Sequence, residues 1–372
     1  MGDTTPGSQA SKIEIAKRLK AIRDIAETPE QYEAAKHALF PGQDLTEVEK
    51  SIAGLSEEDE FALLCRLMET TTHLVRLEQN PIIAGDFIVP DFWARFQPGC
   101  RWGGLGPECS AGFTCLVEVK STMGKSLKIG GSLLRRRRNF AERFSLPLVF
   151  AVRFLRVKQS AVWVMVDASD NNQKSLTITV NDMLHGIRHV LWDEVSYLLH
   201  PDVQFRCVYN RALPNSGVYH PEYGQLVEFE IIGDNNKLTM KESQAGFVSG
   251  FCGGFAPRLL HREKQGAVTV CISAPRVLFC DAPNMIYKFN RLATDEDGRM
   301  SYDASKILAH SDQGGPVPLM TRTLFDWVVD SIEAAGLMSA GGVGAEEQLA
   351  KWRQYGGRGN TEGQETEKHG TD

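Results

Sequence analysis

The sequence lacks any long hydrophobic run. No stretch of the 372 residues contains the roughly 18 consecutive apolar residues that a membrane-spanning helix requires, so we predict no membrane span. The opening residues, MGDTTPGSQASK, lack the basic-then-apolar pattern of a secretion signal. Without that pattern, eight cysteines in a chain of this length indicate the reduced thiols of a cytoplasmic protein rather than a disulfide framework.

Several nucleotide-binding and hydrolase motifs are absent as well. The chain contains no GxxxxGKS, GxxxxGKT or GxGxxG pattern, and Gly250–Gly254 does not follow a predicted strand in any of these arrangements. A nucleotide-binding loop is therefore not predicted. The chain also contains no GxSxG pattern, which leaves a serine hydrolase without support.

The cysteines and histidines do not form a metal-binding pattern. Cys100, Cys109 and Cys115 include no CxxC pair and have no obvious fourth ligand, so ordinary thiols are the better interpretation than zinc ligands. Three other polar residues, spaced by four on a predicted helix, share one face without an HExxH motif, which favours a polar helix face. These residues are His185, His189 and Asp193.

Charge is distributed unevenly along the chain. With 42% hydrophobic and 24% charged residues, the composition permits a sizeable core and argues against global disorder. The net charge of −6, taken alone, argues against a nucleic-acid binder. However, residues 118–158 hold eleven Lys and Arg against two Glu, a local charge of +9, which leaves −15 for the rest. This distribution is compatible with a localised site for a polyanion.

The length predicts two to three domains, at about 150 residues each. Residues 12–80 have helical spacing of apolar residues, interrupted at Pro29. Ser56–Asp59 matches a capping box, so we expect a helix from there to about Gln79, because Pro81 discourages its continuation.

Residues 80–200 predict strand, strand, helix, strand, strand and helix, an order typical of an α/β layer with helices packed on a mixed sheet. The expected strands are Phe87–Phe96, Cys115–Ser121, Leu146–Phe154 and Val162–Val166, and the expected helices are Ser132–Phe144 and Asn181–Leu199.

The following region is expected to be rich in β structure. A hairpin is predicted over Gln225–Met240, with its turn at Gly233–Asn236, and strands are predicted at Val268–Ile272 and Arg276–Cys280. Thr321–Gly336 has the apolar spacing of a helix. Residues 1–11 and 339–372 are polar and are expected to be disordered.

One group of polar residues is a candidate catalytic site. Val89-Pro90-Asp91 precedes one expected strand, and Leu116-Val117-Glu118-Val119-Lys120 lies in the next. Because side chains alternate between the faces of a strand, Glu118 and Lys120 point the same way. If the strands pair, Asp91 joins them. Two carboxylates and an ammonium around one point suit Mg²⁺ and a water molecule.

These residues resemble the PD-(D/E)xK nuclease superfamily, the restriction-endonuclease-like fold that includes Holliday junction resolvases. The likeness spans about residues 60–170. The matching segments are Pro90-Asp91, Glu118-Val119-Lys120, Lys128-Ile129, residues 134–144, residues 146–151 and residues 163–167.

The resemblance implies roles for the matching residues. Asp91 and Glu118 would bind Mg²⁺, with Mn²⁺ able to substitute, and Lys120 would orient or activate the attacking water. Family members often add a carboxylate from the first core helix, where Glu78 is nearer than Glu69 to the strand. An alternative places Asp86 at the metal in place of Asp91, in which case the Pro-Asp match is accidental.

The basic residues after the motif are candidates for phosphate contacts. Lys125 and Lys128 lie in the loop after the catalytic strand, and four arginines follow on the expected helix. Helical spacing places Arg137 nearest the apolar stripe and the others around the exposed sides. On their own these arginines could be a solvated face, but beside a phosphodiesterase site we expect Arg135, Arg136 and Arg138 to contact DNA.

The sequence thus predicts a metal-dependent DNA endonuclease, with RNA as an open alternative substrate. Its expected parts are a helical region (12–55), a nuclease domain (56–200) and a β-rich region (201–338) for recognition or dimerisation. Cutting both strands with one site per chain favours a homodimer. Restriction or DNA repair is the expected role. The alternative is a catalytically inactive nuclease fold that binds nucleic acid or assembles with other molecules.

Overall fold

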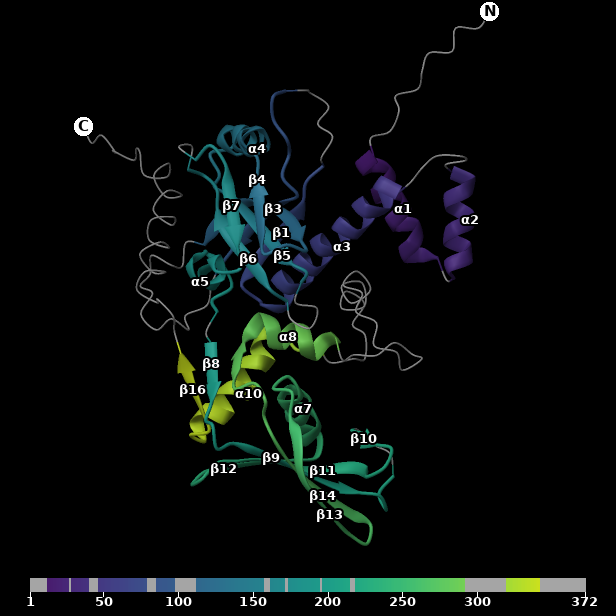
Figure 1. The fold of residues 1–372 in the computed structure, drawn as a ribbon, viewed down its shortest axis with the longest axis vertical. Helices are drawn as coiled ribbons and strands as arrows, with labels where there is room; N and C mark the ends of the chain where they lie inside the picture. Colours follow the sequence, from purple (N-terminus) through teal and green to yellow (C-terminus); the bar gives the residue numbers. More distant parts are fainter. Residues whose placement is uncertain are drawn as a thin grey trace, which may run out of the picture.

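The computed structural model describes residues 12–26, 28–39, 46–78, 85–97, 112–156, 161–170, 173–194, 196–214, 218–291 and 319–341 (Figure 1). The helices are α1 (Lys12–Ile25), α2 (Pro29–Leu39), α3 (Thr46–Leu67), α4 (Gly131–Arg143), α5 (Asp182–His185), α6 (Arg188–Leu191), α7 (Glu242–Gly253), α8 (Ala282–Arg291) and α10 (Arg322–Ala334). The strands are β1 (Thr71–Arg76), β2 (Phe92–Phe96), β3 (Phe113–Thr122), β4 (Ser126–Ile129), β5 (Leu148–Phe154), β6 (Trp163–Asp167), β7 (Leu176–Thr179), β8 (Ser196–Leu199), β9 (Gln204–Asn210), β10 (Tyr219–His220), β11 (Gly224–Ile232), β12 (Lys237–Lys241), β13 (Arg258–Gln265), β14 (Val268–Ala274), β15 (Phe279–Asp281) and β16 (Met338–Gly341).

The first sheet has the strand order β1-β2-β3-β5-β6. β3 and β5 are parallel, whereas the other neighbours are antiparallel. Parallel neighbours need a crossover connection, and α4 lies in the chain between β3 and β5. This mixed sheet with helices packed on it confirms the predicted α/β class (Figure 1).

Side-chain alternation in β3 separates the two faces of this sheet. Val117 and Val119 lie in one hydrophobic cluster together with Phe61 of α3. Leu116 belongs to a second cluster that contains Leu134 of α4. Both faces are therefore covered, and the even-numbered residues of β3 face α4.

The helix predicted to begin near Ser56 has different bounds. α3 runs through Ser56–Asp59 from Thr46, so the capping box does not start a helix there. It ends at Leu67 rather than near Gln79, and Glu69 has a positive φ of 58°. The next residues form β1, because their β-branched side chains suit an extended strand that pairs with β2.

The helix predicted over Asn181–Leu199 is also wrong. The chain forms the short helices α5 and α6, separated at Gly186, and then the strand β8. A side chain at Gly186 would meet the carbonyl oxygen of Met165 at 2.3 Å, so the close approach of the two backbones requires glycine. Asp193, with a φ of 46°, lies in the turn before β8.

The C-terminal region builds a second sheet with the order β10-β11-β9-β14-β13, and β12 pairs with β11. The expected hairpin is present, because β11 and β12 pair from Ile232 and Lys237 onwards. The strand expected at Val268–Ile272 lies within β14, and the one expected at Arg276–Cys280 is the shorter β15. The predicted C-terminal helix is α10.

A third, small sheet joins the two regions. β8 pairs with β15 on one side and with β16 on the other, so the expected domain boundary near residue 200 falls inside a sheet that both regions share. The strand β16 also occupies the start of the tail expected to be disordered; the rest of that tail and residues 1–11 lie outside the described residues. Figure 1 shows α8 and α10 between the two larger sheets.

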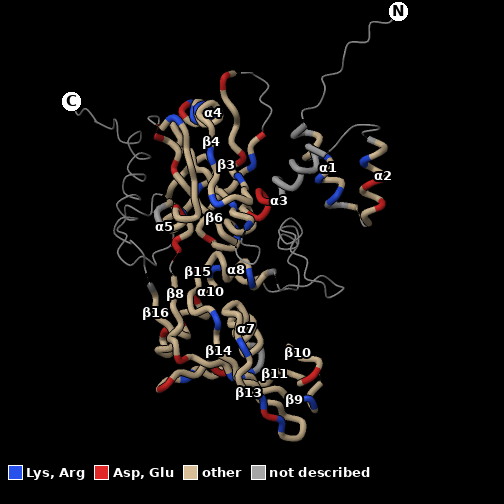
Figure 2. The backbone as a smooth tube through the Cα atoms, viewed as in Figure 1, with Lys and Arg blue, Asp and Glu red and all other residues tan. Residues whose placement is uncertain are grey.

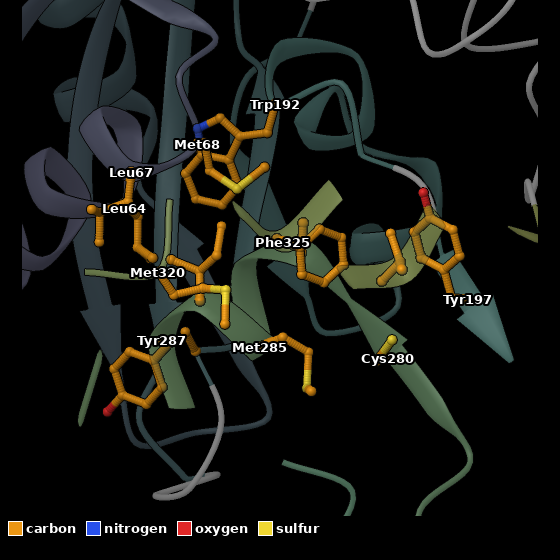
Figure 3. Packing of buried hydrophobic residues seen from close by; sticks show 14 of the residues in the cluster. Leu64, Leu67, Met68, Trp192, Tyr197, Cys280, Met285, Tyr287, Met320 and Phe325 are labelled. Carbon is orange, nitrogen blue, oxygen red and sulfur yellow. The ribbon is translucent and has the colours of Figure 1, made fainter. Parts of the chain in front are cut away.

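One hydrophobic cluster runs from the first sheet into the C-terminal region. Leu64 of α3 and Met68, just after this helix, share it with Trp192, Met285 of α8 and Phe325 of α10 (Figure 3). These side chains are at most 3% exposed. The two regions therefore share this cluster, while the second cluster, beneath α4, belongs to the first region.

We expect both regions to unfold in a single cooperative transition, since the same buried side chains stabilise each of them. Differential scanning calorimetry and tryptophan fluorescence should give the same midpoint. Two separated transitions would contradict the shared core.

Within the described residues, no helix is long and apolar enough to cross a membrane.

Candidate functional site

The two halves of the motif meet in the first sheet. β2 is antiparallel to β3 with Phe92 opposite Val117, so Asp91 lies opposite Glu118. The Asp91 Oδ2 atom accepts a hydrogen bond from the Val119 backbone N–H at 2.7 Å. Asp91 is 4% exposed. A buried carboxylate thus extends the contact between the two strands to the residue just before the start of β2.

Glu118 is the centre of this site. The residue is fully buried on the face of β3 that α4 covers. The Lys120 Nζ atom lies 2.5 Å from Glu118 Oε1, and the Lys120 side chain is 33% exposed, so the site reaches solvent at the ammonium. Within the part of the chain that the structure describes, Glu118 Oε2 has no hydrogen-bond partner.

Burial controls the protonation of this pair. It raises the pKa of the Glu118 carboxyl from 4.5 to about 7; Lys120 and Arg137 oppose the rise, and the Asp91 carboxylate adds to it. Burial lowers the pKa of Lys120, but the carboxylates of Glu118 and Asp91 outweigh it and leave the pKa raised. Lys120 therefore stays protonated at neutral pH, whereas Glu118 is close to its midpoint.

Arg137 is a member of the site that the sequence did not assign to it. Its Nη2 atom lies 2.5 Å from Glu118 Oε1, and its Nη1 atom donates to the Val89 carbonyl. The signal was its position on the apolar stripe of the helix, between Leu134 and Ala141, which are both buried. A charged side chain at a core position requires a partner there.

Three other carboxylates were candidates for the metal. Asp86 is exposed and pairs with Arg135 and Arg136, which places it away from Glu118. The Glu69 carboxylate accepts hydrogen bonds from the backbone and hydroxyl of Thr323. Asp91, rather than Asp86, is thus the carboxylate beside Glu118, and Glu69 belongs to a contact with α10.

Glu78 does not lie on a helix, which corrects the expectation. It is an exposed residue just after β1, next to Leu77, whose backbone N–H donates to the Asp91 carbonyl at 3.0 Å. Among the described residues, no group of three His, Cys, Asp or Glu side chains is gathered as a metal cluster. Asp91, Glu118 and Glu78 therefore do not form a three-carboxylate set.

Two carboxylates are nevertheless enough for Mg²⁺. This ion prefers oxygen ligands, keeps several waters, and commonly binds through one or two carboxylates together with substrate phosphates. The unpartnered Oε2 of the buried Glu118 fits such a ligand. Asp91 and Glu118 are thus the residues that could hold the metal.

The predicted phosphate-binding residues separate into two groups. Arg135 and Arg136 have side chains that are 67% and 41% exposed, and Lys125 and Lys128 are exposed in and beside β4. Figure 2 shows Lys and Arg positions of α4 and β4 in blue. Arg138 is instead 6% exposed and donates to the carbonyls of Ala168 and Gln173. This position corrects the expectation that Arg138 faces outwards, because its guanidinium packs inside the fold.

The alternative metal ligands remain ordinary residues. Cys115 is a buried thiol in β3, and Cys100 and Cys109 lie outside the described residues. His189 contacts the Met183 carbonyl at 2.7 Å and lies 3.6 Å from a Glu194 carboxylate oxygen. The histidine of α6 thus has one partner in α5 and one in the turn after α6.

The chain was compared with protein families, with curated proteins and with solved structures. No protein-family model matches the chain, and no curated protein matches it. Among solved structures, the chain is similar to Hjc of Archaeoglobus fulgidus, a Holliday junction resolvase from an archaeal hyperthermophile. The sequence identity is 19% and the TM-score 0.25, over 37% of this chain and 96% of that one.

Proposed function

We propose that the protein is a metal-dependent DNA endonuclease with a PD-(D/E)xK site. The observation that carries this proposal is the buried Glu118 carboxylate, which has Asp91 opposite it, the Lys120 ammonium 2.5 Å away and one oxygen without a partner. A pure surface ion pair would not require burial of the carboxylate. The order of β3, α4 and β5 supports a restriction-endonuclease-like fold for residues 56–200.

Asp91 and Glu118 would hold Mg²⁺, or Mn²⁺ in its place. When bound, the metal acidifies a water molecule and offsets negative charge on the scissile phosphate. Lys120 remains protonated, so we assign it to orienting the attacking water through an N–H donor rather than to removing its proton. The buried position of Glu118 excludes bulk water from one side of the site.

The remaining parts of the chain have proposed roles as well. Lys125, Lys128, Arg135 and Arg136 would contact phosphates. The sheet and helices of residues 201–338 would recognise the target or form a homodimer, which the cutting of both strands favours when each chain has one site. Restriction or DNA repair is the role proposed for this activity, by analogy with the superfamily that the motif resembles.

The test is incubation of supercoiled plasmid with the full chain and Mg²⁺, followed by gel electrophoresis. We expect nicked and linear products, with no products in EDTA. Parallel reactions with RNA identify the substrate class. Intact DNA with both Mg²⁺ and Mn²⁺, together with retained DNA binding and no metal binding by calorimetry, would instead support an inactive nuclease fold.

We expect the double change Arg135→Ala and Arg136→Ala to weaken DNA binding and to reduce its dependence on salt. Each lost phosphate contact lowers the slope of log affinity against log salt by about 0.9, so the slope should fall by roughly 1.8. Fluorescence anisotropy at several salt concentrations measures this. The matched control is Arg18→Ala with Arg23→Ala, two exposed arginines of α1. An equal slope in both double variants would remove α4 from the interface.

A further inference from the structure

We propose that Arg137 is a positioning residue of this site, which fixes the Glu118 carboxylate against the Val89–Asp91 segment. The expected effect of Arg137 on cleavage rests on the proposed function. The expected effect of Arg137 on the position of the Val89–Asp91 segment does not. Arg137 is 6% exposed and is the member of the run of four arginines that contacts Glu118.

The guanidinium of Arg137 joins two segments that are far apart in the chain. One nitrogen bonds to Glu118, 19 residues away, and another bonds to the Val89 carbonyl, 48 residues away. Val89 is two residues before Asp91. A single side chain on a third element therefore links Glu118 to the segment that carries Asp91.

The chemistry of arginine suits this role. Its planar fork presents several N–H donors in fixed directions, so little freedom is lost for each bond that forms. Lysine is a compact charge on a flexible stem and cannot donate along two fixed directions in the same way. Arg137 is also anchored by its helix, because Leu134 and Ala141 on the same stripe are buried.

The two cations beside Glu118 have different environments. The Lys120 side chain is a third exposed and so faces the substrate side. The Arg137 side chain is 8% exposed and contacts the same oxygen, Oε1, from the side of α4 that packs on the sheet. The free oxygen Oε2 is therefore oriented by a bond that substrate does not reach.

The position of Asp91 depends on this arrangement. Its carboxylate accepts the Val119 N–H, and the segment before it follows α4, since the Ile88 N–H donates to the Arg136 carbonyl at 3.1 Å. If Arg137 no longer holds the Val89 carbonyl, the Val119 amide loses part of its protection. We call the two contacts of Arg137, with Glu118 and with the Val89 carbonyl, the clamp. The rate of hydrogen exchange at the Val119 amide reports whether the clamp is intact, and this measurement needs neither metal nor DNA.

The test compares Arg137→Lys with Arg138→Lys in the full chain. Arg138 is the adjacent residue, is equally buried at 6%, and donates to carbonyls outside the site, so it is a matched control. Both changes keep the charge. We expect exchange at the Val119 amide to be about tenfold faster or more in Arg137→Lys, and unchanged in Arg138→Lys.

Cleavage kinetics give the second readout. For Arg137→Lys we expect kcat to fall about a hundredfold while KM for DNA stays within about twofold, because the carboxylate is misplaced and the phosphate contacts are intact. Arg138→Lys should leave both parameters near wild type. Circular dichroism confirms that each variant is folded.

Several outcomes would overturn the proposal. Equal Val119 exchange in Arg137→Lys and Arg138→Lys would show that Arg137 does not hold the segment. If Arg137→Lys is unfolded, Arg137→Gln takes its place with the same expected exchange. If Arg137→Lys and Arg137→Gln are both unfolded while Arg138→Lys folds, Arg137 contributes to global stability alone and the proposal fails. If wild type does not cleave DNA but the Val119 effect is present, the proposed function fails and the clamp stands.

Discussion

Replacing Glu118 by glutamine is expected to reduce Mg²⁺-dependent plasmid cleavage by at least about a thousandfold. A neutral amide has nearly the same shape as the carboxylate, so Lys120 and Arg137 keep a neighbour of similar size. It does not offer the charge that a divalent cation requires, and metal catalysis contributes several kcal/mol of transition-state stabilisation. The measurement is the rate at which supercoiled plasmid is nicked.

The control for this change is Glu142→Gln on α4, an exposed glutamate of the same basic segment. It removes an equal charge, and we expect wild-type cleavage from it. Far-ultraviolet circular dichroism should be the same for both variants. Equal cleavage by Glu118→Gln and wild type would refute the assignment of Glu118 as a metal ligand.

The rate of cleavage is expected to rise with pH, by about tenfold per unit below the pKa of Glu118, and to level off above it. Burial raises this pKa to about 7, so the carboxyl is mostly protonated in mildly acid solution and must release its proton to bind metal. Because metal and proton compete, more Mg²⁺ should move the midpoint to lower pH. A pH–rate profile at two Mg²⁺ concentrations measures both effects.

The same shift has a consequence for stability without metal. The folded protein keeps a proton on Glu118 between pH 4.5 and about 7, where the unfolded chain has released it. The free energy of unfolding should therefore fall as pH rises through this interval. Glu57, whose pKa burial raises to about 6, acts in the same direction. A rate that does not vary with pH, or stability that increases across this range, would contradict the raised pKa.

The arrangement of Glu118, Lys120 and Asp91 was predictable because two simple rules act on it. Alternation along a strand places Glu118 and Lys120 on one face, and antiparallel pairing with β2 brings Asp91 opposite. The spacing of Asp91 and Glu118 does not show that β2 and β3 pair. From the sequence, the approach of Asp91 to Glu118 could therefore be predicted only on the condition that the two strands pair.

Arg137 was harder to predict, because helical spacing gives a position but not a partner. Its place on the apolar stripe was visible, yet the contact with Glu118 depends on how α4 packs across β3. Arg138 shows the opposite case. Its position suggested an exposed side chain, whereas its guanidinium bonds to the carbonyls of Ala168 and Gln173 inside the fold.

The wrong helix bounds have a tertiary cause. Thr71–Arg76 follows a helix without Pro or Gly, so local spacing favours continued helix, but pairing with β2 stabilises a strand. Ser196–Leu199 likewise becomes a strand because β15 and β16 pair with it on both sides. Such partners lie far away in the chain and cannot be read from a local pattern.

The small sheet around β8 affects how the protein is made. The first sheet draws its strands from residues 71–167, so all of it is synthesised early. β8 gains its partner β16 much later, and the bond between the side chains of His200 and Ser339 spans 139 residues. At about 5–20 residues per second, a ribosome adds that length in roughly 7–28 s. During that time the edge of β8 that later pairs with β16 has no strand partner, and an unpaired strand edge is a site at which other chains can add.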